Sequence, residues 1–236
     1  MADVETRTDS PRRIPTALVG LAVAAMPLVF GALLFVSACR LDWMLGWIYV
    51  GIVVVDVAIT WACLLRWNPE LIERRMRFPK GTKTWDKVWA VLYAPVMIAV
   101  YVVAGLEARD DASSLPGAAW LLGVGIFVPG ATVLMRSMVV NPFFEKTVRI
   151  QTDHGHRVID TGPYAYVRHP GYAGFAGWVL STPLLLASAW AFLPAVLAVV
   201  GIVIRTALED RTLHAELSGY PQYAARVRFR LIPGVW

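Results

Sequence analysis

Long apolar segments alternate with short polar ones along most of the chain. A helix needs about 20 apolar residues to cross a bilayer core about 30 Å thick. Segments of about this length predict spans at 16–39, 43–65, 88–106, 118–140, 172–187 and 189–208. The fifth is short and contains Pro183, so the last two are predicted to form one tight helical hairpin. The pattern predicts an all-α, polytopic integral membrane protein with five to six transmembrane helices, a C-terminal helical hairpin and a cytoplasmic C-terminal segment.

The composition agrees with a membrane protein. Of the 236 residues, 57% are hydrophobic and only 17% are charged, against about 25% charged in soluble domains. Several of the 10 Trp residues stand at the ends of the apolar segments, as in the aromatic belts of membrane interfaces.

The basic residues predict the orientation. All 22 Lys and Arg except Arg40 and Arg109 fall in the N-terminus, in 66–87, in 136–168 or in 205–230. Since Lys and Arg are enriched on the cytoplasmic side, both termini are predicted to be cytoplasmic, in a bacterial plasma membrane or an equivalent membrane. The net charge of +5 is first a topology signal, with attraction to anionic membrane lipids as a second effect. Nothing in the sequence favours a nucleic-acid partner.

The chain divides into three parts. Residues 1–15 are polar and predict a flexible cytoplasmic tail. Residues 16–140 hold the first four spans and the cytoplasmic loop 66–87, in which residues 68–75 predict a short amphipathic helix on the membrane surface. Residues 141–236 form the third part, with a small hairpin predicted around 153–155.

The segment 157–174 is dense in polar, aromatic and conformationally restricted residues. Gly162 permits a positive φ or close backbone approach, and Pro170 restricts its neighbours. With Tyr164 and Tyr172 as walls, this segment predicts a pocket for a planar or zwitterionic ligand. His169 could donate to a carboxylate or exchange protons near neutral pH. The alternative is a connector whose tyrosines only anchor at the interface.

A second group of ionisable residues follows the last span. Arg205 and Glu209 are four residues apart and share a helix face, either as a surface ion pair or facing a cavity. Asp56 is an acidic residue deep inside a predicted span, either functional or hydrogen-bonded to a neighbouring helix. His154 and His156 lie on an irregular loop without a Cys partner, so no metal site is predicted.

The motifs occur in a recognisable order. Gly162-Pro-Tyr164-x-Tyr166-Val-Arg168-His169-Pro170-x-Tyr172-x-Gly174 is followed by the helical hairpin, Arg205-x3-Glu209-Asp210-x2-Leu213, Gly219-Tyr220-x2-Tyr223 and Arg230-Leu-Ile-Pro233. Over residues 140–236 this closely resembles the isoprenylcysteine carboxyl methyltransferase family, with its phospholipid methyltransferase relatives.

The resemblance implies an S-adenosylmethionine-dependent methyltransferase embedded in the membrane, with 141–236 as its cofactor-binding core. It implies a cytoplasmic cofactor site and a lipophilic acceptor that enters from the bilayer. The implied catalytic residues are Arg205, which would orient the acceptor, and Glu209. The implied cofactor-binding residues are Gly162, Tyr164, His169, Pro170, Tyr172, Glu209 and Asp210. The chain departs from the family at Asp210, where the family has a second Glu.

Several alternatives stay open at this point. A carboxylate acceptor, isoprenylcysteine-like, would need only a cation, whereas a lipid amine would have to lose a proton, for which Glu209 could serve. Membrane reductases of the sterol-reductase type, which use NADPH, share an Arg-His-Pro-x-Tyr pattern, but the acidic pair and the short chain favour a methyltransferase. A non-enzymatic membrane protein on the same scaffold is a third class. The oligomeric state and the roles of Asp56 and the loop 66–87 are not predicted.

Overall fold

The computed structural model describes residues 16–76, 81–110 and 115–236, and this part of the chain is helical with irregular connections. The predicted tail 1–15 lies outside the described residues. The α-helices are α1 (Thr16–Ala38), α2 (Met44–Trp67), α3 (Pro69–Met76), α4 (Thr84–Arg109), α5 (Ala118–Val140), α6 (Pro170–Leu185), α7 (Phe192–Glu216) and α8 (Tyr220–Arg226). Two 3-10 turns, η1 (Thr152–His154) and η2 (Gly162–Ala165), lie between α5 and α6.

The six predicted spans correspond to α1, α2, α4, α5, α6 and α7. Within the described ranges, α2, α4, α5 and α7 are long and apolar enough to cross a membrane. The described apolar part of α1 is shorter, Ala24–Ala38, and α6 has 16 residues with Pro183 inside it. The predicted all-α, polytopic membrane fold is therefore confirmed.

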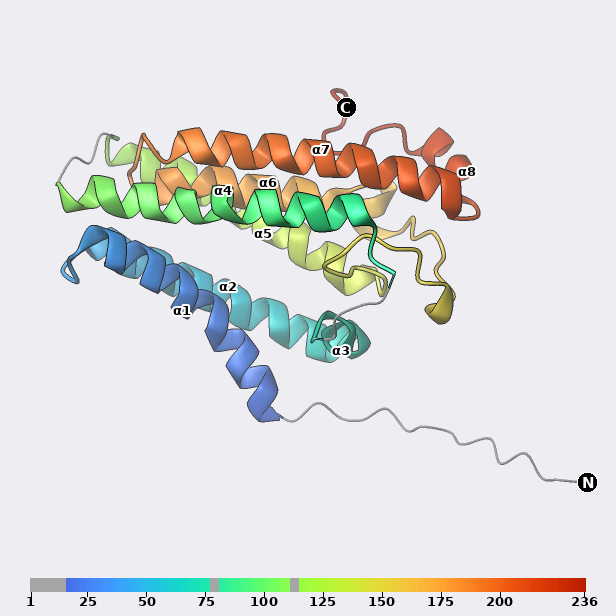
Figure 1. Cartoon of the computed structure of the whole chain (residues 1–236), viewed down its shortest axis with the longest axis horizontal. Helices are drawn as coiled ribbons and strands as arrows, with labels where there is room; N and C mark the ends of the chain where they lie inside the picture. Colours follow the sequence, from blue (N-terminus) through green and yellow to red (C-terminus); the bar gives the residue numbers. More distant parts are fainter. Residues whose placement is uncertain (1–15, 77–80, 111–114) are drawn as a thin grey trace, which may run out of the picture.

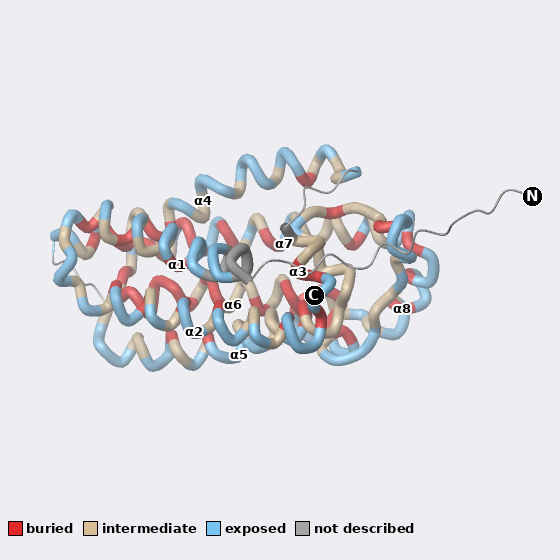
Figure 2. The backbone as a smooth tube through the Cα atoms, turned by 90° about the horizontal axis from the view of Figure 1, so that it is seen from below, coloured by how far each residue is buried: buried red, intermediate tan, exposed pale blue. Residues whose placement is uncertain are grey.

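The long helices run side by side along the molecule (Figure 1). The α1–α2 and α6–α7 connections lie at one end, together with the last residues of α4, so Arg40 and Arg109 belong to this end. The opposite half of the molecule holds α3, α8 and the segment 141–169. The outer helix faces are exposed in Figure 2, and many of their side chains are apolar, such as Leu92 and Leu121, as expected of a surface that faces lipid.

The predicted hairpin of α6 and α7 is confirmed, and α6 also packs closely on α5. The chain reverses between α6 and α7 at Ala187, which has a φ of 53°. A Cβ on Gly174 of α6 would lie 2.5 Å from the carbonyl oxygen of Gly130 in α5. Only glycine allows this backbone approach, which fixes where the segment preceding α6 meets α5.

Two local predictions need correction. Residues 69–76 form the predicted short helix, but its apolar residues Leu71 and Ile72 are fully buried against Met138 rather than turned to lipid. The prediction of a hairpin around 153–155 was wrong. The 3-10 turn η1 occupies this place, with Gly155 directly after it, and no described residue forms a strand. The side chain of His156 accepts from the backbone N–H of Gln151 at 3.4 Å, which replaces part of the strand pairing.

Candidate active site

A cavity of about 640 Å³ opens where the segment 141–169 meets the helices, within the usual range of about 300–1,000 Å³ for small-molecule sites. We call one part the polar chamber, which is lined by the segment 141–169, the start of α6 and the C-terminal half of α7. We call the other part the apolar crevice. It is lined by α1, α2, α5 and α6 through Ala25, Met26, Asp56, Val57, Thr60, Ala131, Leu134 and Trp178. The two parts form one continuous cavity.

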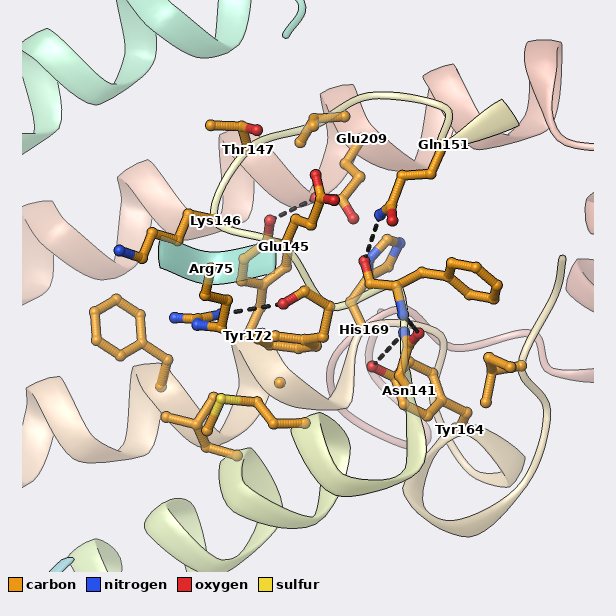
Figure 3. Close-up of a pocket in the computed structure, with 18 of the residues that line it drawn as sticks. Arg75, Asn141, Glu145, Lys146, Thr147, Gln151, Tyr164, His169, Tyr172 and Glu209 are labelled. Atoms are coloured by element: carbon orange, nitrogen blue, oxygen red, sulfur yellow. Dashed lines mark hydrogen bonds between the residues drawn. The ribbon is translucent and has the colours of Figure 1, made fainter. Parts of the chain in front are cut away.

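Tyr172 and Glu209 meet inside this cavity (Figure 3). The Tyr172 hydroxyl, on α6, donates to Oε2 of Glu209, on α7, at 2.5 Å. The Tyr172 ring stacks on His169 with centroids 5.9 Å apart. This contact between the segment 157–174 and the ionisable group that follows the last span holds the Glu209 carboxylate in place beside an aromatic wall.

Asp210, the next residue, faces away from the cavity and is only 1% exposed. Its carboxylate accepts from Arg168 at 2.8 and 3.0 Å, from Arg230 at 2.8 Å, from the Tyr220 hydroxyl at 2.9 Å, and it lies 3.2 Å from His169 Nε2. Burial works to lower the pKa of Arg168, but the Asp210 carboxylate outweighs it and raises that pKa above the ordinary value. Asp210 therefore fastens the C-terminal segment to the α6–α7 hairpin.

Arg205 lines the cavity and pairs with a different helix from the one expected. Its Nη2 lies 3.0 Å from Oδ1 of Asp86 and donates to the Lys146 carbonyl at 2.8 Å. The guanidinium packs over the rings of Trp89, at 4.4 Å, and Tyr172, at 5.6 Å. Asp86 also accepts from the backbone N–H of Val148 at 2.8 Å. The surface ion pair of Arg205 with Glu209, one of the two alternatives left open by the sequence, is not among the ion pairs of the described residues.

Of the predicted site residues, five line the cavity: Tyr164, His169, Tyr172, Arg205 and Glu209. The other three, Gly162, Pro170 and Asp210, lie outside its wall.

Two of the three outside residues shape the backbone of the site. Gly162 has a φ of 58°, which starts η2 and brings the Tyr164 hydroxyl within 3.0 Å of Nδ2 of Asn141. Pro170 is the first residue of α6, where its missing N–H costs nothing. Asp56, whose role was open, faces the apolar crevice. Among the described residues no group of three His, Cys, Asp or Glu side chains could hold a metal ion.

Sequence reasoning missed the contribution of α3 and of residues 141–156. Arg75 of α3 lines the cavity, donates to the Phe144 carbonyl at 3.1 Å and lies 5.8 Å from the Phe144 ring. Burial lowers the pKa of Arg75 to about 10, and the charge of Arg205 adds to this. Glu145, also in the wall, is paired with Arg149 at 2.8 Å. The basic composition of the loop 66–87 is the one feature of the sequence that could have indicated a contribution of α3 to the cavity, although nothing in the loop singles out Arg75.

Comparisons with known proteins found similarity to one family of methyltransferases. The model of the isoprenylcysteine carboxyl methyltransferase family matches residues 123–215. A probable protein-S-isoprenylcysteine O-methyltransferase of Oryza sativa subsp. indica is 40% identical over 43 residues, 18% of this chain and 22% of the relative. The corresponding Schizosaccharomyces pombe protein is 44% identical over 43 residues, 18% of each chain. The matched region thus spans about a fifth of these curated relatives.

The solved structure of the eukaryotic intramembrane Ras methyltransferase ICMT has a similar fold. It shares 16% sequence identity with a TM-score of 0.52, over 94% of this chain and 88% of that one. The chain is therefore an integral membrane protein that shares the fold of this solved structure. Residues 123–215 match the model of the isoprenylcysteine carboxyl methyltransferase family, the family that the order of the motifs resembles.

Proposed function

We propose that the protein is an S-adenosylmethionine-dependent methyltransferase that acts on a lipophilic acceptor within the membrane. The observation that carries this proposal is the single cavity that joins the polar chamber to the apolar crevice. A methyl transfer needs a polar cofactor and a hydrophobic acceptor side by side and shielded from water, and this cavity has a part suited to each.

The residues of the polar chamber fit S-adenosylmethionine. Thr147 Oγ1, Gln151 Oε1 and Arg205 Nε are buried polar atoms of the cavity wall without a hydrogen-bond partner, which a polar ligand would satisfy. Tyr172 and His169 offer flat aromatic faces, and Glu209 offers a carboxylate. When bound, this cofactor supplies a methyl group on a positively charged sulfur.

Arg205 and Glu209 have separate roles in this proposal. Arg205, held by Asp86, lies over one face of the Tyr172 ring, and the Tyr172 hydroxyl holds Glu209. An isoprenylcysteine-like carboxylate acceptor needs only a cation to orient it, which Arg205 supplies. A lipid amine acceptor would first lose a proton, and Glu209 is the nearby base. In both cases the apolar walls exclude water.

The relatives reported above are named methyltransferases, which favours this proposal over NADPH-dependent reduction.

We also place the polar chamber on the cytoplasmic side. The end of the molecule that carries it holds α3 and α8 with their basic residues, while Arg40 and Arg109 lie at the opposite end.

The test is methyl transfer from methyl-labelled S-adenosylmethionine to a total lipid and isoprenoid extract, with the protein in nanodiscs and the product identified by mass. A labelled lipid heavier by one methylene is expected, and Glu209→Gln should abolish it. Glu216→Gln is the matched control, since Glu216 pairs with Lys83 outside the cavity. Calorimetric titrations with S-adenosylmethionine and with NADPH complete the test, and binding of NADPH alone would overturn the proposal.

A further inference from the structure

The middle of α2, which lies beside α1 in Figure 1, brings a carboxyl group to the apolar crevice. Asp56 lines the cavity together with Val57, Thr60, Trp61 and Leu64. This spacing is that of one face of a helix, so α2 turns a single face toward the cavity. Asp56 and Thr60 are one turn apart and bring a carboxyl and a hydroxyl group to this face, which is otherwise largely apolar.

Neither of these two polar groups is satisfied by the fold. Within the described part of the chain, the Asp56 carboxyl group has no hydrogen bond or ion pair and the Thr60 hydroxyl has no hydrogen bond. Two cations of the cavity wall are engaged elsewhere, since Arg205 pairs with Asp86 at 3.0 Å and Arg75 donates to a backbone carbonyl at 3.1 Å. An ionisable side chain inside a membrane is costly, and such residues mark the paths and sites of ligands. A bound molecule is therefore the expected partner of Asp56.

The surroundings restrict which chemical group this partner carries. A carboxyl group accepts a hydrogen bond whether it is ionised or protonated, and a threonine hydroxyl both donates and accepts. A hydroxyl group of a ligand matches both, because it donates to Asp56 and accepts from Thr60. An ammonium group would also donate, but it would bury a second charge between apolar walls, and the ion pair does not fully offset that desolvation. The acyl chains of membrane lipids carry no donor at all.

We propose that the methyl acceptor carries a free hydroxyl group on its apolar body, and that Asp56 and Thr60 bind this hydroxyl in the apolar crevice. This rests on the proposed function and narrows its substrate class from lipophilic acceptors in general to hydroxylated ones. Asp56 is a specificity-determining residue in this proposal. It selects which lipid is methylated, while Arg205 and Glu209 act on the group that receives the methyl.

The methylated lipid itself reports whether the hydroxyl group is present. The full chain in nanodiscs is incubated with methyl-labelled S-adenosylmethionine and a total lipid and isoprenoid extract. The labelled products are then treated with acetic anhydride, which acylates hydroxyl and amino groups, or with the N-hydroxysuccinimide ester of acetic acid, which acylates amino groups. The main wild-type product should gain an acetyl group from the anhydride only. Labelled lipids without a free hydroxyl should form at least about tenfold more slowly, because a site built around a hydrogen bond rejects ligands that cannot form it.

Four variants measure the selectivity, which is the ratio of hydroxylated to unhydroxylated labelled product. Asp56→Leu should lower this ratio at least about tenfold without slowing methylation of the unhydroxylated lipids. Asp56→Asn keeps a carbonyl oxygen that accepts and should retain the wild-type ratio. Thr60→Val, equal in shape, should lower the ratio about fivefold and gives the same test if Asp56→Leu does not fold. Thr212→Val is the matched control, because Thr212 lies outside the cavity and donates to the Leu208 carbonyl of its own helix, and it should keep the wild-type ratio.

The outcomes separate this inference from the function on which it rests. If the wild-type protein labels no lipid, the proposed function and the hydroxyl site are both overturned. If the labelled product has no free hydroxyl, or if Asp56→Leu and Thr60→Val keep the wild-type ratio, the hydroxyl site is overturned and the proposed function stands. A product that both reagents acylate, together with an Asp56→Asn variant as defective as Asp56→Leu, would show that the carboxylate binds an ammonium group and would overturn the hydroxyl assignment.

Discussion

Replacing the neighbouring acids Glu209 and Asp210 by their uncharged amides is expected to change different properties of the protein. Asp210 accepts hydrogen bonds from Arg168, Arg230 and Tyr220 behind the cavity wall, whereas Glu209 accepts from Tyr172 inside it. We expect Asp210→Asn to loosen the C-terminal segment, and Glu209→Gln to weaken cofactor binding while the segment stays in place.

The magnitude for Asp210→Asn follows from its partners. The Arg168 side chain is 5% exposed and also donates to the backbone carbonyls of Val227 and Arg228 at 2.9 and 2.8 Å. Removing one partner of such a buried pair costs about 3–5 kcal/mol. The Arg230 side chain is 33% exposed and contributes less, so the lower end, about 3 kcal/mol, is the better expectation. At about 1.4 kcal/mol per factor of ten, the open form of the segment rises about a hundredfold.

Limited trypsin digestion of the protein in nanodiscs measures this opening. The exposed Arg226 and Arg228 become cleavable when the segment detaches, and the cleavage rate follows the open population if reclosing is fast. Asp210→Asn should be cut about a hundredfold faster than the wild type, and Glu209→Gln at the wild-type rate. If Asp210→Asn were as resistant as the wild type and lost only cofactor affinity, Asp210 would be the cofactor-binding residue that the sequence predicted.

Three further variants test the site. Arg205→Met should lower kcat more than 100-fold, measured by single-turnover kinetics, and change the Kd of the cofactor less than threefold, measured by calorimetry. An unchanged kcat would show that Arg205 has no role in the reaction. Arg75→Met should raise the KM of an anionic acceptor about tenfold. Arg74→Met, which removes a side chain outside the cavity wall, should leave that KM unchanged. Equal effects of the two substitutions would refute a direct role of Arg75 in binding the acceptor. Because burial lowers the pKa of His156 from its ordinary 6.5 to about 4, acid protonates the unfolded state first. The free energy of unfolding should therefore fall by up to about 3 kcal/mol as the pH drops from 6.5 to 4. Thermal unfolding of His156→Gln should show a weaker dependence of stability on pH over this range. An unchanged dependence would mean that other groups cause it.

The spans could be predicted because the bilayer sets one dominant requirement, an apolar segment of sufficient length. The predicted 118–140 coincides with α5, and 43–65 lies within two residues of α2 at each end. The last predicted span, 189–208, corresponds to α7, whose helix continues out of the span to Glu216, as the helix face shared by Arg205 and Glu209 predicts. Its polar continuation is stabilised by packing on the C-terminal segment, which hydropathy does not register.

Pairings between distant residues could not be predicted. Asp86 is an ordinary acidic residue in the first turn of a helix until the fold brings it to Arg205, 119 residues later. Neighbouring residues on a helix point about 100° apart, so one of Glu209 and Asp210 had to turn away from the cavity. Nothing in the sequence says which one. Gln151 lies in an irregular segment, where an unpaired buried oxygen becomes visible only once its surroundings are known.

The two ends of the cavity come from different parts of the chain. On the proposed function, the cofactor end is built by residues after 140, mostly within the range that matches the family. The acceptor end is built by α1 and α2, which precede that range, together with α5 and α6, which lie within it. Asp56 lies in the middle of α2, where a carboxyl group in the bilayer costs about 2.5–3.5 kcal/mol, and it faces the acceptor end. On the proposed function, the residues that would hold the cofactor therefore lie mostly in the part of the chain that matches the family model, whereas side chains of α1 and α2 outside that part would contribute to the choice of acceptor.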